Sequence, residues 1–196
     1  MLTFRFGTMN CGKSTDLIFR ERIATKSGAK TLIVKPTFDT RDGSYMGYGP
    51  FKSRCVHAEK PALYVKDINV QQILTTGADT IFVDEIQFFT PKDIDALVEL
   101  SDTHKKTIAC YGLKTDIRGK LFDTSEKLLA VADYSTTVGQ KDCDLCGKNP
   151  ASHHLRYVDG EIDLTGTAKL VESGSVAYYS VCRQCWNEKQ KMYQRS

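Results

Sequence analysis

The sequence lacks the features that mark several classes of protein. No apolar run approaches the roughly 20 residues that a membrane-spanning helix requires. The net charge of +3 is too small to indicate a nucleic-acid-binding surface by itself. There is no internal repeat and no low-complexity tract, which excludes solenoid and disordered classes. A strand-like segment begins within two residues of the start, so we expect no signal peptide, a cytoplasmic location and reduced cysteines.

What is present is the composition of a globular protein. The 196 residues are 41% hydrophobic and 26% charged, which is enough apolar material for a buried core. This length predicts one main domain with a small appendage. The mild excess of positive charge is compatible with a phosphorylated ligand.

Strand-like and helix-like segments alternate over the first two thirds of the chain. We predict strands at Leu2–Phe6, Thr31–Lys35, Thr80–Asp84 and Thr107–Tyr111, and helices at Thr15–Thr25 and Pro91–Thr103, the second capped by Thr90. Such alternation predicts an α/β fold with a mainly parallel sheet and helices on both faces. The segment Asp39–Phe51 is rich in Gly, Asp and Tyr, and it predicts a loop or a hairpin.

Eight residues after the first strand fit the phosphate-loop pattern G-x-x-x-x-G-K-[ST]. They are Gly7, Thr8, Met9, Asn10, Cys11, Gly12, Lys13 and Ser14. The loop would present backbone N–H groups to phosphate oxygens, with Lys13 near the β and γ phosphates and Ser14 on Mg²⁺. An ordinary glycine-containing turn is the alternative, and the flanking strand and helix disfavour it.

A second motif is the apolar strand that ends in Asp84 and Glu85. A carboxylate in this position holds the Mg²⁺ shell in phosphate-loop enzymes, and the next one could accept a proton from an attacking hydroxyl. Both motifs fall at the carboxyl ends of predicted strands, where ligands of such sheets bind. The simple start of a polar loop is the alternative. Arg41 follows the second strand and could bind phosphate or be a solvated loop residue.

The third motif is a pair of C-x2-C sequences, Cys143 with Cys146 and Cys182 with Cys185. In a protein expected to be reduced, four thiolates favour a structural Zn²⁺ over two disulfides. We interpret the neighbouring His153 and His154 as ordinary strand residues rather than as further metal ligands. Because strand–helix alternation gives way to turns and paired cysteines, we expect a nucleotide-binding domain of residues 1–135 and a β-rich zinc domain of residues 136–196.

Together these motifs resemble the type II thymidine kinases, which combine a phosphate-loop domain with a zinc-bearing lasso domain. The resemblance spans nearly the whole chain. It is carried by Gly7–Ser14, Lys35-Pro36, Asp39–Arg41, Val83–Phe89, Tyr111–Asp116, the cysteine pairs, and Tyr178 shortly before Val181-Cys182-Arg183. The chain departs from the family pattern in three places: Ile117 replaces a common aromatic residue, Ser173-Gly174 replaces two glycines, and Thr8 stands where proline is frequent.

The resemblance implies transfer of the γ-phosphoryl group of ATP to the 5′-hydroxyl of thymidine or deoxyuridine. Glu85 would be the general base, while Ser14 and Asp84 would hold Mg²⁺. The nucleoside would be bound by Met9, Phe88, Leu113, Phe122, Val171, Ser173, Gly174 and Tyr178, with Val171–Tyr178 forming the lasso. The family also implies a homotetramer that is inhibited by deoxythymidine triphosphate.

A competing hypothesis is a phosphate-loop ATPase whose zinc module binds nucleic acid. Such a module should be basic and rich in aromatic side chains. Between Cys143 and Cys185 the acidic residues outnumber the basic ones, so we expect no nucleic-acid partner and no membrane partner.

Overall fold

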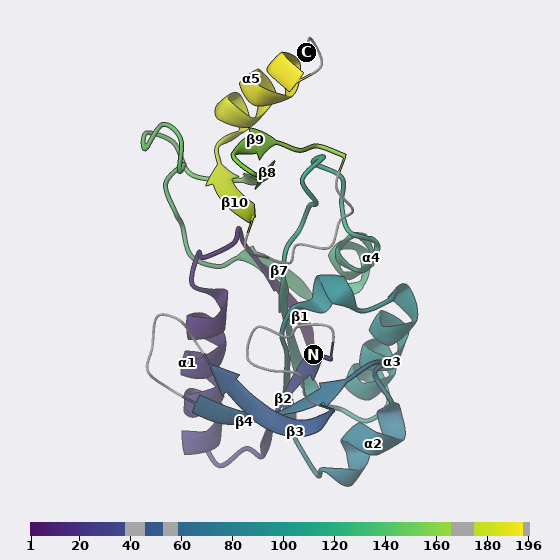
Figure 1. Cartoon of the computed structure of the whole chain (residues 1–196). Helices are drawn as coiled ribbons and strands as arrows, with labels where there is room; N and C mark the ends of the chain where they lie inside the picture. Colours follow the sequence, from purple (N-terminus) through teal and green to yellow (C-terminus); the bar gives the residue numbers. More distant parts are fainter. Residues whose placement is uncertain (38–45, 53–58, 166–174, 194–196) are drawn as a thin grey trace.

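The computed structural model describes residues 1–37, 46–52, 59–165 and 175–193, and it contains two sheets (Figure 1). The larger sheet has seven strands in the order β3-β4-β2-β5-β6-β1-β7, all parallel to their neighbours except β3. These strands are β1 (Leu2–Phe6), β2 (Thr31–Pro36), β3 (Gly47–Lys52), β4 (Glu59–Val65), β5 (Thr80–Val83), β6 (Thr107–Gly112) and β7 (Tyr134–Thr137). The predicted α/β class is thereby confirmed.

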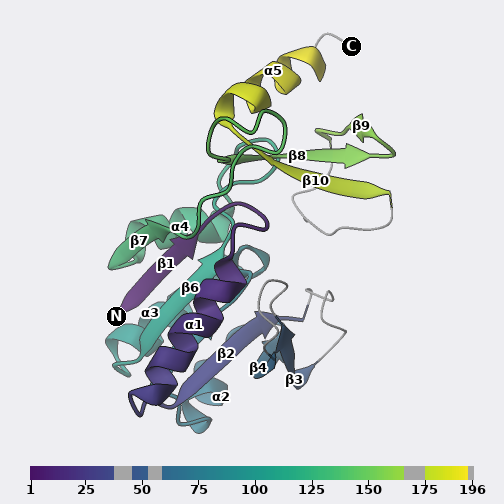
Figure 2. The same cartoon turned by 90° about the vertical axis from the view of Figure 1, so that its left-hand side faces the viewer.

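Helices cover both faces of this sheet (Figure 2). The helices of the described residues are α1 (Lys13–Lys26), α2 (Val70–Thr75), α3 (Pro91–Asp102), α4 (Asp123–Val131) and α5 (Arg183–Tyr193), with a short 3-10 helix η1 (Ile86–Phe88). Helix α1 lies on one face, and α2, α3 and α4 lie on the other (Figure 2). Helix α5 belongs to the small sheet instead.

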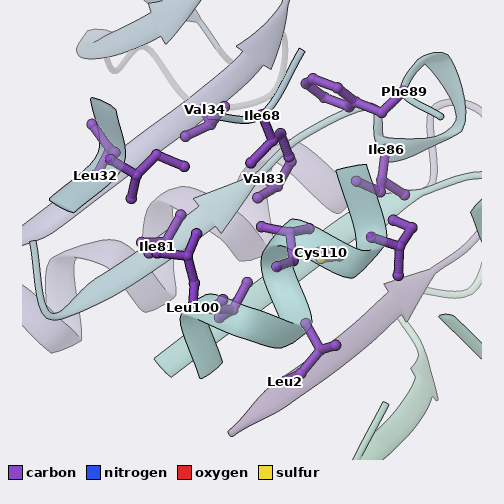
Figure 3. Close-up of a cluster of buried hydrophobic side chains, with 14 of the residues drawn as sticks. Leu2, Leu32, Val34, Ile68, Ile81, Val83, Ile86, Phe89, Leu100 and Cys110 are labelled. Carbon is purple, nitrogen blue, oxygen red and sulfur yellow. The ribbon is translucent and has the colours of Figure 1, made fainter. Parts of the chain in front are cut away.

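The central strands are apolar on both sides because both faces of the sheet are covered. Ile81 and Val83 point to the α3 side, where Leu97 and Leu100 complete the larger core (Figure 3). Phe82, between them in the sequence, points to the α1 side and packs in a second core with Leu17 and Tyr111. The period of two along each strand therefore places one core on each face.

The start of α3 follows the prediction from its sequence. The backbone N–H and the hydroxyl of Thr90 both donate to the Asp93 carboxylate, at 2.8 and 2.7 Å. Pro91 follows at the first helical position, where its missing N–H costs nothing. The Asp93 carboxylate also accepts the Ile68 N–H at 2.6 Å, which joins the start of α3 to the segment before α2.

Three strands of the large sheet, β3, β4 and β7, were not predicted individually. Strand β3 lies at the end of the segment Asp39–Phe51, which was expected to form a loop or a hairpin, and it pairs antiparallel with β4. Residues 39–45 of that segment lie outside the described residues. Strand β7 pairs with β1 and spans residue 135, the expected boundary between domains.

A small antiparallel sheet lies beyond the carboxyl ends of the parallel strands (Figure 1). Its strands are β8 (His153–Val158), β9 (Glu161–Ile162) and β10 (Val176–Val181), in the order β10-β8-β9. Leu155 and Val181 are fully buried in its own small core. Within the described residues, no helix is both long enough and apolar enough to cross a membrane.

Candidate active site

The phosphate-loop segment connects β1 to α1 in a tight turn. Asn10 and Gly12 adopt left-handed conformations, with φ of 58° and 96°. The Lys13 ammonium donates to the carbonyl oxygens of Thr8 at 2.7 Å and Gly7 at 3.4 Å, so its charge lies against the loop. A Cβ at Gly7 would lie 2.5 Å from Cys11 Sγ, so only glycine fits there. A loop of this shape before a helix N-terminus favours anions.

The predicted carboxylate pair follows β5 at the same edge of the sheet. The Asp84 N–H donates to the Val34 carbonyl at 2.9 Å, which fixes the point where β5 ends. Glu85 then takes a left-handed conformation with φ 51° and ψ 44°. Both side chains are buried. A non-glycine residue in this region of φ and ψ is uncommon, and such strain concentrates at functional sites.

The buried side chain of Gln87 links this carboxylate to the next strand. Its Nε2 donates to Glu85 Oε2 at 2.5 Å, and its Oε1 accepts the Leu113 N–H at 3.0 Å. A Cβ at Gly112 would lie 2.5 Å from that Oε1, so the glycine allows η1 to approach β6. Gln87 stands in the Val83–Phe89 motif, but its role in orienting Glu85 was not predicted.

An apolar cluster adjoins Leu113 and gathers side chains from distant segments. Leu113 and Ile117 are buried, and Met9, Phe122 and Tyr178 pack against them. Four residues predicted to bind a nucleoside are thus brought together, and Ile117 joins them. Phe88, at the end of η1, is half-buried and is not part of this cluster. The predicted positions Arg41, Val171, Ser173 and Gly174 lie outside the described residues.

The four paired cysteines form one cluster. Their sulfur atoms all lie within 4.8 Å of one another. Cys146 Sγ and Cys182 Sγ are 3.9 Å apart, far beyond the roughly 2.05 Å of a disulfide bond. Zn–S bonds of about 2.3 Å in a tetrahedron would place the sulfurs about 3.8 Å apart, so the donor set fits Zn²⁺.

The surroundings of one member of the cluster, Cys143, favour a thiolate, whereas burial and the contacts with the other three cysteines raise the pKa of the Cys185 thiol. Burial raises the pKa of the Cys143 thiol, but the backbone N–H groups of Cys182, Cys146 and Leu145 outweigh it and lower that pKa to about 6. Cys110, by contrast, is fully buried in the core of the large sheet, and burial raises its pKa well above the usual range. The four-sulfur cluster is therefore the candidate structural zinc site.

Side chains of the small sheet and of α5 contact the phosphate loop at Met9 and the apolar cluster at Ile117. The Met9 N–H donates to His154 Nε2 at 2.9 Å, and Ser180 Oγ donates to the Met9 carbonyl at 3.0 Å. Trp186 on α5 donates its indole N–H to the Ile117 carbonyl at 3.2 Å. His154 lies in β8 as expected, but its bond to a residue 145 positions earlier leaves no pattern in the sequence.

These observations define the class of the protein: an α/β protein with a phosphate-loop segment, a buried carboxylate pair, an apolar cluster beside them and a four-cysteine cluster. Comparison with known proteins gives the family. The family model described as "Thymidine kinase" matches residues 1–186. The chain therefore belongs to the thymidine kinase family. It is accordingly a kinase, and membership implies ATP-dependent phosphoryl transfer to a nucleoside.

Individual relatives agree over almost the full length. The thymidine kinase of Encephalitozoon cuniculi (strain GB-M1) is 32% identical over 96% of this chain and 87% of its own. That of Enterobacteria phage T4 is 30% identical over 95% of each chain. That of Pasteurella multocida (strain Pm70) is 34% identical over 96% of this chain and 97% of its own. The N-terminal domain of the DNA packaging ATPase from bacteriophage phi29 covers 57% of this chain with a TM-score of 0.33 and 16% identity, too little to indicate function.

Proposed function

We propose that the protein transfers the γ-phosphoryl group of ATP to the 5′-hydroxyl of thymidine, and also of deoxyuridine. The observation that carries this proposal is the Gln87 side chain, which bonds Glu85 with one end and the Leu113 N–H with the other. The Glu85 carboxylate and Leu113 of the apolar cluster are therefore linked by one side-chain amide. This arrangement suits a base that acts on a hydroxyl of a nucleoside, and we propose that the apolar cluster lines the slot that holds it.

The residues take the following roles in this proposal. Loop residues Gly7 to Ser14 bind the triphosphate through backbone N–H groups, and Lys13 neutralises its β and γ phosphates. Glu85 accepts the proton of the 5′-hydroxyl as that oxygen attacks the γ-phosphorus. The bond from phosphorus to the β–γ bridging oxygen breaks, and ADP leaves with its electron pair.

We propose that Mg²⁺ is held by Ser14 and Asp84. A hydroxyl and a carboxylate are oxygen ligands that suit this ion, and Asp84 is buried just after β5, at the same edge of the sheet as the loop that follows β1. When bound, the ion offsets the charge of the phosphates. Arg41 is proposed as an additional phosphate contact.

The two parts of the chain are proposed to bind different substrates. Residues 1–135 are proposed to bind the triphosphate, and residues 136–196 to close over the nucleoside. Phe88 and the lasso positions Val171, Ser173 and Gly174 are proposed to complete the nucleoside site. A flat slot with apolar walls and a few fixed backbone contacts suits a pyrimidine base.

The proposed nucleoside site can be tested by comparing substrates that differ in their base. The five side chains of the apolar cluster, Met9, Leu113, Ile117, Phe122 and Tyr178, carry no charge, so they cannot read the base edge through an ion pair. A lasso that pairs with N3–H and the carbonyls of thymine would meet deoxycytidine with an altered donor and acceptor pattern. Each unpaired buried group costs about 1–3 kcal/mol, so we expect about 10- to 100-fold lower kcat/KM for each mismatch. Deoxyuridine lacks one methyl group, worth about 1 kcal/mol, and should remain a substrate.

The measurement is kcat/KM for thymidine, deoxyuridine, deoxycytidine and deoxyadenosine at matched low concentrations. Deoxyuridine is the control, because it keeps the hydrogen-bonding edge and loses only the methyl group. Phosphorylation of deoxycytidine or deoxyadenosine as fast as thymidine would contradict a base-reading slot.

We propose a homotetramer that is inhibited by deoxythymidine triphosphate. Two large apolar side chains one turn apart on α1, Phe19 and Ile23, are 63% and 53% exposed and offer a surface for a second copy. Phe19→Glu should therefore lower the assembled mass measured by light scattering at micromolar protein. Met192→Glu, at an equally exposed position on α5, is the control and should keep the wild-type mass. A monomeric wild-type protein would refute the assembly.

A further inference from the structure

Both backbone polar groups of one phosphate-loop residue are bound by the small sheet. His154 Nε2 accepts the Met9 N–H, and Ser180 Oγ donates to the Met9 carbonyl. His154 and Ser180 lie directly opposite each other in the register of β8 and β10. Each side chain is 2% exposed, so neither contact competes with bulk water. Two cross-strand neighbours thus bind both backbone polar groups of a single phosphate-loop residue, one in each of the two peptide units that flank its Cα.

The protonation of His154 matches an acceptor role. An imidazole that accepts at Nε2 is neutral and carries its one proton on Nδ1. Burial, reinforced by the Lys13 charge, lowers the His154 pKa to about 3, so the ring stays neutral at working pH. Its Nδ1 is buried and has no hydrogen-bond partner among the described residues. A buried N–H group without a partner destabilises the folded protein. An apolar side chain would fill the same space without this cost, so a histidine here is explained by the hydrogen bond that its Nε2 accepts.

Met9 contacts both the proposed nucleoside site and the proposed triphosphate site. Its side chain packs against the buried residues Leu113 and Ile117, against which Tyr178 also packs. Its backbone leads into Asn10 and Gly12, whose left-handed conformations form the turn before Lys13. Tyr178 is on β10, two residues before Ser180, so a molecule that contacts Tyr178 also contacts the strand that holds Met9.

We propose that His154 and Ser180 are positioning residues that hold Met9 from the small sheet and thereby couple nucleoside binding to triphosphate binding. This inference rests on the proposed function, which assigns Gly7–Ser14 to the triphosphate and the apolar cluster to the nucleoside. A nucleoside that orders β10 against the slot also fixes Met9, and a fixed Met9 presents the following turn in its binding geometry. Because coupling between two binding sites is reciprocal, the triphosphate strengthens nucleoside binding by the same factor.

Four variants test this coupling. His154→Leu keeps an apolar side chain in the space but removes the acceptor, and Ser180→Ala removes one hydroxyl with little change in volume. His154→Gln restores an acceptor, because Oε1 of glutamine reaches about as far as Nε2. His153→Gln is the matched control, since that imidazole contacts Trp186 and Ser152 rather than the phosphate loop.

The measurements are dissociation constants for thymidine and for a non-hydrolysable ATP analogue with Mg²⁺, each taken alone and with the other saturating. For the wild-type protein we expect each ligand to strengthen the other by about 5- to 150-fold, the usual range for coupled sites. His154→Leu and Ser180→Ala should bring this factor close to one. His154→Gln should recover most of it, and His153→Gln should keep it. Zinc content and melting temperature, recorded for every variant, separate this effect from loss of folded protein.

A wild-type coupling factor that persists in both His154→Leu and Ser180→Ala would overturn the proposal, as would a wild-type factor of one. If His154→Leu does not fold, Ser180→Ala decides alone. Failure of the wild-type protein to bind the analogue at all would instead overturn the assignment of the phosphate loop.

Discussion

Replacing Glu85 by glutamine should lower kcat by about 10²- to 10⁴-fold, the usual contribution of a general base. Glutamine has nearly the same shape and cannot accept the proton of the 5′-hydroxyl. Its amide oxygen can still accept from Gln87, so the contact between Gln87 and the Leu113 N–H should persist. The phosphate loop is untouched, so affinity for the ATP analogue should stay within about twofold of wild type.

The measurement combines steady-state kinetics with equilibrium binding of the ATP analogue. Glu99→Gln is the matched control, because that carboxylate is 54% exposed on α3 and contacts only His104 among the described residues. It should leave kcat unchanged. Near-normal turnover of Glu85→Gln would contradict the role of this residue as the base.

Removing the expected Zn²⁺ should strongly destabilise the small sheet. We expect about one Zn²⁺ per chain in reduced protein, bound by Cys143, Cys146, Cys182 and Cys185. Zinc-finger peptides draw about 10–16 kcal/mol of folding free energy from their metal, and the small sheet has only a few buried side chains of its own. Cys146→Ser should therefore lose zinc and unfold the small sheet.

Loss of that sheet removes contacts on both sides of the nucleoside slot. Met9 would lose its bonds to the small sheet, and Ile117 would lose its bond to Trp186. We therefore expect thymidine turnover to fall below about 1% of wild type, because misplacing reacting groups by about 1 Å already costs about 100-fold.

Elemental analysis and thermal unfolding check this prediction. Cys110→Ala is the control, because it deletes a buried thiol in the core of the large sheet without touching the cluster. It should lower the melting temperature slightly and keep the zinc. Fully active, reduced protein that contains no zinc would contradict the structural role of the metal.

Strands β2, β5 and β6 could be predicted because each is a short, continuous apolar run, as expected of strands that are covered on both faces. Helix α3 could be predicted because its cap is encoded by neighbours in the chain. The edge strands lack such a pattern. All four residues of β7 are exposed, and the strand exists because β1 offers it an unpaired edge. Strand β4 contains Pro61, which lies opposite Pro50 of the edge strand β3 and precedes Leu63, where the pairing of β4 with β2 begins.

Some residues of the candidate site could likewise be predicted from the sequence, and others could not. The phosphate loop, the carboxylate pair and the cysteine pairs are contiguous motifs, so the sequence displays them directly. The link through Gln87 depends on how closely η1 approaches β6, and the contacts of His154 and Ser180 with Met9 join segments far apart in the sequence. No spacing rule predicts such contacts, because they depend on how the small sheet sits on the large one.

The most direct test of the central claim follows the labelled γ-phosphate of ATP with purified protein, Mg²⁺ and thymidine. We expect label to appear in thymidine 5′-monophosphate, with one ADP formed for each molecule of product. We expect no transfer to 5′-deoxythymidine, which lacks only the accepting hydroxyl. Release of labelled inorganic phosphate without labelled nucleotide, independent of thymidine, would contradict the account and favour a phosphate-loop ATPase.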